Sequence, residues 1–209
     1  MISMLLSEAA KILGSSLTGE DVVFLGCSTD SRTTEEGNLF IALKGEYFDG
    51  HQYISVAEKN GASSLIVDSE VVYTKPFIRV EDTRKAMGLL AKSWREKITI
   101  PLIAITGSNG KTTVKEMVTS ILSTVSNVHA TSGNLNNDIG VPKTLFGLNK
   151  KHNYAVIEMG ANHLGEIEWL SKISSPNIAV ITQCAPAHLE GFKNVESIAK
   201  AKAEIFSGL

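Results

Sequence analysis

Cysteine is scarce: the 209 residues contain only Cys27 and Cys184, far apart and without metal-type spacing. Neither a disulfide framework nor a thiolate metal site is therefore expected. No stretch is long and apolar enough to span a bilayer. The first sixteen residues lack a basic leading segment, and Glu8 and Lys11 interrupt their apolar stretch, which argues against a secretory signal. These absences favour a cytoplasmic protein with reduced thiols.

No excess of charge of either sign is present, with 20 Lys and Arg against 22 Asp and Glu. This balance gives no general electrostatic reason to expect nucleic acid or an anionic membrane as a partner, although a local basic patch is compatible with it. The length accommodates one large domain or two smaller ones. We expect a monomer without a nucleic-acid partner and without membrane insertion.

Residues 1–82 predict a small N-terminal α/β domain. Apolar residues at positions 2, 5, 6, 9, 12 and 13 fit one face of a short helix that ends near Gly14. Further along, strands are expected at 22–26, 38–43, 64–68 and 77–80, and a helix at 49–62.

Residues 83–209 predict a second domain built on a mostly parallel sheet. A helix over 82–97, which Asp82 or Thr83 would cap, leads into it and provides a hinge. Strands are expected at 99–106, 127–131, 154–159 and 177–183, and helices at 114–125, 164–173 and from 195. Such alternation implies an α/β fold with helices on both faces of a parallel sheet, and ligands gather at the carboxyl ends of its strands.

A glycine-rich turn, "TGSNGKTT", separates the first of these strands from its helix. Its N–H groups and the helix dipole would bind phosphate, Lys111 would add a full charge, and the Thr112 hydroxyl is placed to meet Mg²⁺. The turn is shorter than the general phosphate loop, because Ile105 occupies the position of the first glycine. A plain strand-to-helix turn with an exposed lysine is the alternative. The candidate ATP-binding residues are Gly107, Ser108, Asn109, Gly110, Lys111, Thr112 and Thr113.

The helix behind this turn is predicted from one apolar stripe. The stripe comprises Val114, Met117, Val118, Ile121, Leu122 and Val125.

Polar residues follow two later strands. Glu158 ends "YAVIEM", where a carboxylate would reach the metal side of a bound nucleotide; a solvated glutamate is the alternative. The loop "TSGNLNNDIGVP" is rich in asparagine, and these side chains are either ordinary turn residues or groups that orient a substrate or a metal-bound water. From this loop Asn134 and Asn137 are the candidate substrate-binding residues.

Two basic side chains near the end of the chain are further candidates for a functional role. His188 in "QCAPAHLEGF" is either an ordinary loop histidine or a ligand. Lys202 falls on the apolar face of the last helix, whereas Lys200 does not, so Lys202 either extends to solvent or has a buried task. Burial disfavours the ammonium form and leaves an amine that reacts with electrophiles such as carbon dioxide. The apolar face comprises Val195, Ile198, Ala199, Ile205 and Phe206.

Together these segments resemble the Mur ligases, the ATP-dependent enzymes that attach amino acids to the peptidoglycan precursor. "TGSNGKTT" is similar to their short ATP loop, "AHLEGF" to their histidine segment and "AKAEIF" to the helix with their carbamylated lysine. "GNLNNDIGVP" and "EMGANHLGEI" resemble the member that joins D-Ala-D-Ala to UDP-N-acetylmuramoyl-tripeptide. The sister enzyme that adds the third amino acid usually has a serine-rich segment instead.

The resemblance implies a reaction and a set of roles. ATP phosphorylates the tripeptide carboxylate, the amine of D-Ala-D-Ala attacks the acyl phosphate, and phosphate leaves. It also implies that Lys111 neutralises phosphate charge, and that Thr112 and Glu158 hold one Mg²⁺. His188 and a carbamylated Lys202 would serve a second Mg²⁺, because two anions that approach each other need metal ions to offset their repulsion. Lys111, His188 and Lys202 are the catalytic candidates.

Near the N-terminus, "STDSR" and "NLFIALKGEYFDGH" resemble the domain that holds the UDP end of the substrate. A capped turn with a structural Asp–Arg pair is the alternative. The candidate UDP-binding residues are Ser28, Asp30, Ser31 and Arg32.

Members of the family also have a third, C-terminal domain that closes over ATP, and no segment here corresponds to it. We therefore expect an N-terminal and central portion of a ligase that does not complete ligation alone. The alternatives are the sister ligase, a phosphotransferase and a non-catalytic nucleotide-binding module. Lys202 argues against the nucleotide-binding module, because a protein that only binds nucleotide does not need a carbamate-forming lysine.

Overall fold

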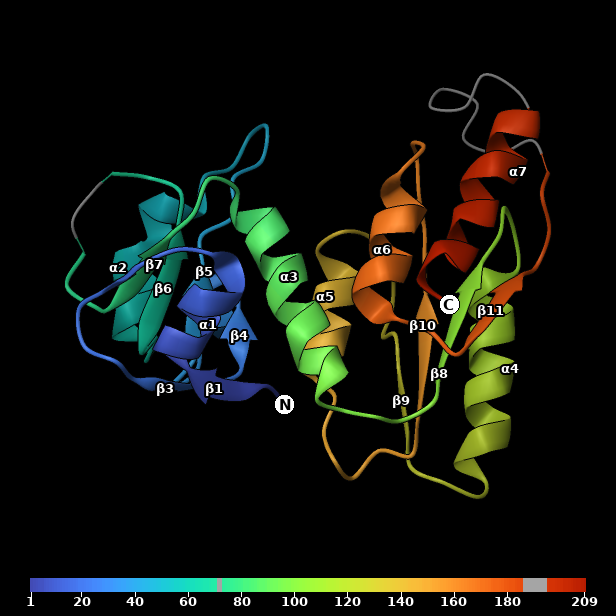
Figure 1. Cartoon of the computed structure of the whole chain (residues 1–209), viewed down its shortest axis with the longest axis horizontal. Helices are drawn as coiled ribbons and strands as arrows, with labels where there is room; N and C mark the ends of the chain where they lie inside the picture. Colours follow the sequence, from blue (N-terminus) through green and yellow to red (C-terminus); the bar gives the residue numbers. More distant parts are fainter. Residues whose placement is uncertain (71–72, 186–194) are drawn as a thin grey trace. The chain divides into compact units, whose positions relative to one another are not determined.

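The computed structural model describes residues 1–70, 73–185 and 195–209, which form two compact units, Met1–Ser93 and Trp94–Leu209 (Figure 1). Helix α3 (Thr83–Glu96) contains the boundary. Both units combine strands and helices, so the α/β class expected from the sequence is confirmed.

The first unit is built on a five-stranded sheet and a separate two-stranded pair. Its strands are β1 (Ser3–Leu5), β2 (Leu17–Thr18), β3 (Val23–Leu25), β4 (Cys27–Ser28), β5 (Leu39–Ile41), β6 (Ser64–Val67) and β7 (Phe77–Arg79). The large sheet has the order β2-β7-β6-β5-β4, in which β4 to β7 are parallel and β2 is antiparallel to β7. Strands β1 and β3 pair antiparallel.

Helices α1 (Leu6–Leu13) and α2 (Ile54–Lys59) belong to this unit, as do the 3-10 turns η1 (Ser31–Thr33) and η2 (Gly50–Tyr53). Apolar side chains of β5, β6 and β7 pack against Ile54 and Ala57 of α2. One layer of the core of the first unit therefore lies between its sheet and α2. Leu39, Ile41 and Ile66, which alternate with these residues along β5 and β6, are also fully buried, so the opposite face of the sheet is covered as well.

The predicted helix at the N-terminus is wrong in its first turn, because residues 3–5 form strand β1. Ile2, Met4 and Leu6 are buried while Ser3 and Leu5 point outward, which is the two-residue alternation of a strand. Over so few residues, the apolar positions fit both the period of a helix and the two-residue period of a strand. Pairing with β3 decides between them, since Met4 lies opposite Phe24.

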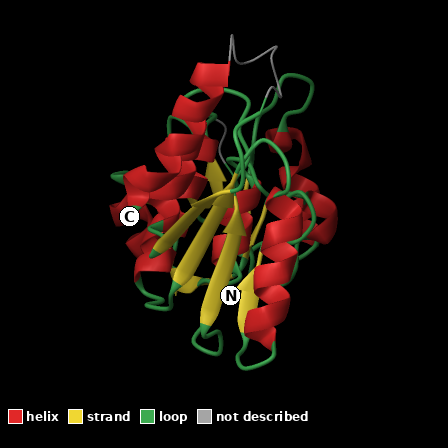
Figure 2. Cartoon of the chain, turned by 90° about the vertical axis from the view of Figure 1, so that its right-hand side faces the viewer, coloured by secondary structure: helices red, strands yellow, loops and turns green. Residues whose placement is uncertain are grey.

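The second unit is built on a four-stranded sheet in the order β11-β8-β10-β9, in which all pairs are parallel. Its strands are β8 (Leu102–Thr106), β9 (Val128–Ala130), β10 (Tyr154–Glu158) and β11 (Ile178–Ile181). Its helices are α4 (Lys111–Ser123), α5 (Gly140–Phe146), α6 (Glu166–Ser174), α7 (Val195–Ala203) and the 3-10 turn η3 (Glu204–Gly208). Figure 2 shows helices on both sides of the sheet, as the parallel pattern predicts.

Two helix predictions in this unit need correction. Helix α4 begins at Lys111 rather than 114, and only its row Val114, Val118 and Leu122 packs on the sheet. The adjacent row is exposed, because a stripe of six residues is wider than the contact with the sheet. This outer row comprises Met117, Ile121 and Val125. Helix α5 was not predicted, because it is short and its first turn carries a glycine and a proline.

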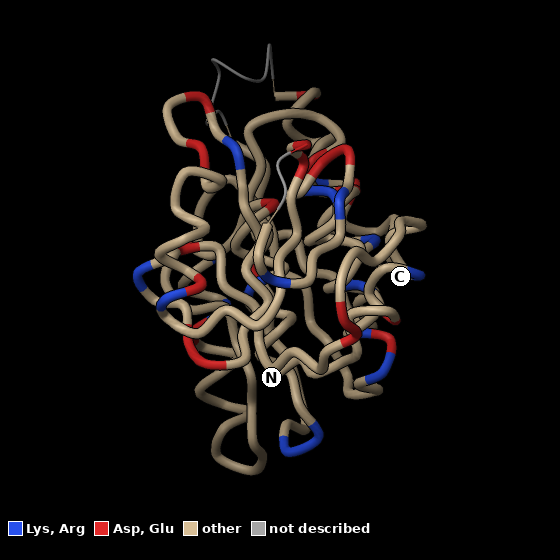
Figure 3. Tube along the Cα trace, turned by 90° about the vertical axis from the view of Figure 1, so that its left-hand side faces the viewer, with Lys and Arg blue, Asp and Glu red and all other residues tan. Residues whose placement is uncertain are grey.

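Charge is distributed without segregation, and Figure 3 shows Lys and Arg interspersed with Asp and Glu along the trace. Among the described residues, no helix has the length and apolar character needed to cross a membrane. Cys27 and Cys184 are both free thiols.

Candidate functional site

The glycine-rich turn lies between the end of β8 and the start of α4, at the carboxyl edge of the second sheet. Gly107 and Gly110 have φ of +149° and +76°, which favour glycine. A Cβ at Gly107 would lie 1.9 Å from Thr182 Oγ1. That hydroxyl donates a 2.6 Å hydrogen bond to the Asn109 carbonyl. The turn therefore needs glycine at 107 for its backbone angle and for space.

Ser108 joins this turn to the segment that follows β11. Its N–H donates to the Gln183 carbonyl at 2.8 Å, and its Oγ donates to the Ala185 carbonyl at 2.9 Å and accepts from the Ala185 N–H at 3.0 Å. Cys184 lies between these two contacts and is exposed. The turn is thus fixed on one side by β8, which precedes it, and on the other by hydrogen bonds to the segment that follows β11.

Lys111 curls back over the turn at the N-terminus of α4. Its Nζ donates to the carbonyls of Gly107 at 2.9 Å and Ser108 at 3.5 Å. Thr112 and Thr113 are exposed in the first helical turn. A 13-residue helix with its N-terminus under a glycine-rich turn and a lysine is a site for phosphate.

Glu158 at the end of β10 is buried, with 2% of its surface exposed. Thr112 Oγ1 donates to its Oε2 at 2.9 Å, and Asn136 Nδ2 donates to its Oε1 at 2.8 Å. Both donors are neutral, so the hydrogen bonds leave the negative charge uncompensated. The structure therefore brings Glu158 to the first turn of α4.

The oxygen atoms around Glu158 suit Mg²⁺, which binds through one or two carboxylates together with substrate phosphates. Within residues 1–70, 73–185 and 195–209, no group of three or more His, Cys, Asp and Glu side chains could hold a metal ion. The Glu158 carboxylate and the Thr112 hydroxyl fit a magnesium ion that takes further ligands from phosphate oxygens.

The asparagine loop divides into two roles. Asn137 Oδ1 accepts from Ile139 N at 3.3 Å and Gly140 N at 2.9 Å, so it caps the start of α5. Asn134 is exposed and its carbonyl accepts from Asn136 N at 2.8 Å. Asn136, which was not among the candidates, is the residue that reaches Glu158. The sequence does not show which of Asn134, Asn136 and Asn137 contacts Glu158, because all three are asparagines in one loop.

Lys202 on α7 is buried, with 3% of its surface exposed. Burial lowers its pKa, and the charge of Lys111 lowers that pKa further, whereas Cys184, Glu166 and Glu204 act in the opposite direction. Lys202 therefore lies within electrostatic range of the phosphate turn. Val195 and Phe206, expected on the same buried face, are exposed.

His188 lies outside the described residues. Glu204, two residues after Lys202, accepts hydrogen bonds from Gly165 N at 2.8 Å and Glu168 N at 3.2 Å. A carboxylate at this helix N-terminus complements the α6 dipole. The contact ties the end of α7 to the loop that follows Glu158 and β10.

In the first unit, the four UDP-binding candidates form one turn at the end of β4. The Asp30 carboxylate accepts from Arg32 N at 3.0 Å, Nε at 2.9 Å and Nη2 at 2.7 Å. Ser28 Oγ donates to the Asp30 carbonyl at 2.9 Å, and Ser31 is buried. The hydrogen bond and charge of Asp30 raise the pKa of Arg32. The capped turn with an Asp–Arg pair is thus present.

Exposed aromatic residues follow β5, the neighbour of β4. Tyr47 is 92% exposed, and the rings of Phe48 and Tyr53 stack with centroids 5.4 Å apart. Because β4 and β5 are parallel, this loop and the Asp30 turn follow the same edge of the sheet. Aromatic faces at such an edge suit a planar heterocycle. Tyr47 and Phe48 lie in the segment "NLFIALKGEYFDGH", which resembles the UDP-binding domain, but they were not among the candidate UDP-binding residues.

Comparison with known families accounts for both units. The model of the Mur ligase middle domain matches residues 105–209. The chain belongs to the Mur ligase family. A second model, the Mur ligase family catalytic domain, matches residues 24–95. The resemblance to Mur ligases drawn from the short motifs is therefore confirmed.

Two curated relatives that match the whole chain carry the same name. The UDP-N-acetylmuramoyl-tripeptide–D-alanyl-D-alanine ligases of Escherichia coli and Haemophilus influenzae are 48% and 49% identical to the whole chain. The chain covers 46% and 47% of their lengths, so it spans about half of these curated relatives.

Solved structures of Mur ligases have the same fold. A MurF crystal structure from Acinetobacter baumannii matches the whole chain with a TM-score of 0.95 and 39% identity, over 47% of that protein. MurF ligase from Thermotoga maritima in complex with ADP matches 87% of the chain with a TM-score of 0.81 and 34% identity, over 43% of that protein.

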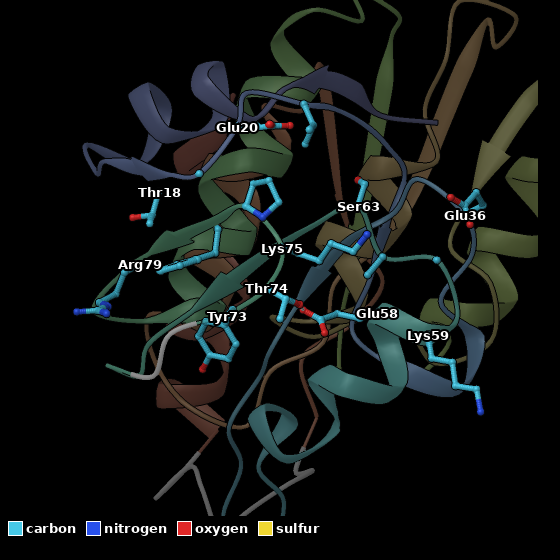
Figure 4. A pocket seen from close by; sticks show the side chains of 16 residues that line it. Thr18, Glu20, Glu36, Glu58, Lys59, Ser63, Tyr73, Thr74, Lys75 and Arg79 are labelled. Carbon is cyan, nitrogen blue, oxygen red and sulfur yellow. The ribbon is translucent and has the colours of Figure 1, made fainter.

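A cavity of about 1050 Å³ in the first unit is distinct from these sites. Ser63 and Pro76, which precede β6 and β7, place it at the amino edge of the parallel strands, opposite the Asp30 turn. Figure 4 shows Glu20, Glu58 and Lys75 among its labelled side chains. Its wall mixes charges of both signs and selects no ligand class.

Proposed function

We propose that the chain provides the substrate- and ATP-binding parts of a cytoplasmic ligase that joins D-Ala-D-Ala to UDP-N-acetylmuramoyl-tripeptide. Residues 1–82 bind the UDP end of the substrate, and residues 83–209 bind ATP. The observation that carries the proposal is the buried Glu158 carboxylate, hydrogen-bonded to Thr112 at the start of α4. The names of the similar ligases support the choice of substrates.

The turn at 107–110 and the first N–H groups of α4 bind the ATP phosphates in this proposal. Lys111 exchanges its contacts with the Gly107 and Ser108 carbonyls for phosphate oxygens. The ADP complex of the Thermotoga maritima relative supports a nucleotide as the ligand. Thr112 and Glu158 hold Mg²⁺, which offsets the repulsion between ATP and an anionic substrate.

The proposed reaction has two steps. An oxygen of the tripeptide carboxylate attacks the γ-phosphorus of ATP, the bond to the β-phosphate oxygen breaks, and ADP leaves. The amine of D-Ala-D-Ala then attacks the carbonyl carbon of the acyl phosphate, loses a proton to solvent or base, and phosphate departs with the C–O bonding electrons. Lys111 stabilises the charge that develops on the transferred phosphate.

Lys202 acts in this proposal as a carbamate. Burial and the charge of Lys111 lower its pKa, which favours the neutral amine that attacks the carbon of carbon dioxide. An N–C bond forms and the nitrogen loses one proton, so the buried amine becomes an anionic group that would serve, as His188 would, as a ligand of the second Mg²⁺. Isotopically labelled bicarbonate should give a carbamate carbon resonance that is absent in Lys202→Gln.

The UDP end binds along the carboxyl edge of the first sheet in this proposal. Arg32 gives up some of its hydrogen bonds to Asp30 and donates to the diphosphate instead. The exposed ring of Tyr47 stacks on the uracil. Ser28 and Ser31 shape the turn, and Asn134 and Asn137 border the peptide end of the substrate. Arg32→Ala should raise the KM for the UDP substrate without changing the KM for ATP.

A phosphate-release assay tests the function. The protein is prepared at the full length of its relatives and supplied with Mg²⁺-ATP, UDP-N-acetylmuramoyl-tripeptide and D-Ala-D-Ala. Release that requires both substrates supports the proposal. Release that requires a single amino acid instead of the dipeptide favours the sister ligase, and nucleotide binding without release under any combination favours a binding module.

A further inference from the structure

A lysine inside helix α4 has no place in the function described so far. Lys115 is 1% exposed and is among the largest fully buried side chains of the described residues. It lies on the inner side of α4, beside the row Val114, Val118 and Leu122 that packs on the sheet. A methionine of similar length would fill this space without desolvating a charge, so the ammonium itself has a task.

The contacts of Lys115 point to the metal site. Its Nζ donates a 2.9 Å hydrogen bond to the carbonyl of Thr131, the first residue after β9. The Glu116 carboxylate, 2.7 Å away and largely exposed, provides the counter-charge. Thr131 is itself buried, so its carbonyl has no solvent to replace a missing donor.

Thr131 in turn is hydrogen-bonded to the backbone of Glu158. Its N–H donates to the Val156 carbonyl at 3.0 Å, and its Oγ1 accepts from the Glu158 N–H at 2.9 Å. Thr131 therefore fixes the backbone at the end of β10 where the carboxylate begins. It also begins the loop that carries Asn136, the second donor to that carboxylate.

Two links consequently join α4 to the end of β10. Thr112 contacts the Glu158 carboxylate directly, and Lys115, one turn later, contacts the Glu158 backbone through Thr131. The first link uses the hydroxyl and carboxylate that would ligate Mg²⁺. The second uses no ligand atom, so ion binding does not have to replace any of its hydrogen bonds, and it sets the distance between the phosphate-binding helix and the metal carboxylate.

We propose that Lys115 is a positioning residue for the Glu158 carboxylate and acts through Thr131. The inference rests on the proposed function, because it requires Glu158 and Thr112 to bind a divalent cation with a nucleotide. Lys115 itself touches neither nucleotide nor metal.

Binding of Mn²⁺ in the presence of ADP, measured by electron paramagnetic resonance on the full-length protein, tests the proposal without turnover. Lys115→Met should weaken Mn²⁺ binding by about tenfold or more, which is typical for loss of a residue that supports a metal ligand. Lys115→Arg, which still donates to the Thr131 carbonyl, should restore most of the affinity. Lys172→Met removes an exposed lysine paired with Glu168 in the same unit and should leave affinity unchanged.

The Thr131→Val variant keeps the backbone carbonyl and removes only the Oγ1 that accepts from Glu158. It should weaken Mn²⁺ binding in the same direction, and the double variant with Lys115→Met should lose no more than the worse single variant, because both act through one link. If Lys115→Met does not fold, Thr131→Val and Lys115→Arg decide the outcome.

A purely structural lysine would give a different result. Lys115→Met would then lower the unfolding temperature while Mn²⁺ affinity stayed at the wild-type value, and this outcome overturns the inference. Wild-type protein that binds no Mn²⁺ with ADP would refute the proposed function and this inference together. Wild-type binding with an unaffected Lys115→Met refutes the inference alone.

Discussion

Thr112 Oγ1 lies 2.9 Å from Glu158 Oε2, across 46 residues of sequence. The hydrogen bond connects the first turn of the helix behind the glycine-rich turn to the end of strand β10. Because β8 and β10 are parallel neighbours, their carboxyl ends bring a phosphate-binding helix and a buried carboxylate to one place. This relationship is the basis of the first two predictions.

Replacing Glu158 with glutamine should abolish the effect of Mg²⁺ on nucleotide affinity. Glutamine keeps the shape and accepts a hydrogen bond from Thr112, but it removes the negative charge that the cation needs. Calorimetry should show that Mg²⁺ no longer strengthens ADP binding, a loss of about tenfold or more, while metal-free binding is retained. An unchanged response to Mg²⁺ would remove Glu158 from the metal site.

Two neighbouring asparagines should behave differently when each is changed to alanine. Asn137→Ala removes the cap of α5 and should lower the free energy of unfolding by about 1 kcal/mol, with an unaltered Mg²⁺ response. Asn136→Ala removes a donor to the Glu158 carboxylate and should weaken Mg²⁺-dependent nucleotide binding. Urea denaturation and calorimetry on both variants separate the two effects, and equal effects would contradict the assignment.

The sequence predicted the carboxyl-edge arrangement because alternation of strands and helices specifies a parallel sheet. The turn at 107–110 and Glu158 could therefore be found from their places at the ends of strands. The buried Lys202 could be found from its place on the apolar face of the last helix. Asn136 and Asn137 could not be distinguished, because only the path of the backbone decides which amide faces Glu158. The role of Lys115 could not be predicted either, because the sequence of the helix does not show that the partner of Lys115 is a carbonyl in the loop after β9.

The thiol of Cys184 should be the one that reacts with a thiol reagent. Cys184 is exposed, whereas burial raises the pKa of the Cys27 thiol and disfavours the reactive thiolate. Cys184 also lies between the two residues that contact Ser108, so Mg²⁺-ATP in the turn should slow its modification. A colorimetric thiol assay at pH 8 should show one fast phase that Cys184→Ser removes. Persistence of that phase in Cys184→Ser would contradict the prediction.

Stability of the second unit should fall as the pH decreases below 6.5. Burial lowers the pKa of both His129 and His152, whose rings stack with centroids 4.7 Å apart. Below the ordinary value of 6.5, the unfolded chain binds protons that the folded unit does not, so the free energy of unfolding decreases until the folded pKa values are reached.

Trp94 and Trp169 are the only tryptophans, and Trp169 on α6 lies well inside the second unit while Trp94 donates to the Leu148 carbonyl of that unit, so their fluorescence follows its unfolding. Denaturation at pH 7.5 and 5.5 should show the loss of stability in wild type. His152→Phe keeps an aromatic ring against His129 but cannot titrate, and should reduce the difference between the two pH values. A difference of the same size in the variant would assign the effect to other groups.

Gly107 and Gly110 should tolerate alanine to different degrees, although both have positive φ. At Gly110 a Cβ would meet no atom within 4 Å, so Gly110→Ala adds only backbone strain of about 1 kcal/mol. At Gly107 the Cβ would overlap Thr182 Oγ1, which also holds the Asn109 carbonyl, so Gly107→Ala should destabilise the unit by about 3 kcal/mol or more. Tryptophan fluorescence in urea measures both. Adding Thr182→Ala removes the clashing atom, so it should recover part of the stability lost in Gly107→Ala. The same addition should recover none of the stability lost in Gly110→Ala. Recovery in both variants or in neither would show that space at Gly107 is not what the turn requires.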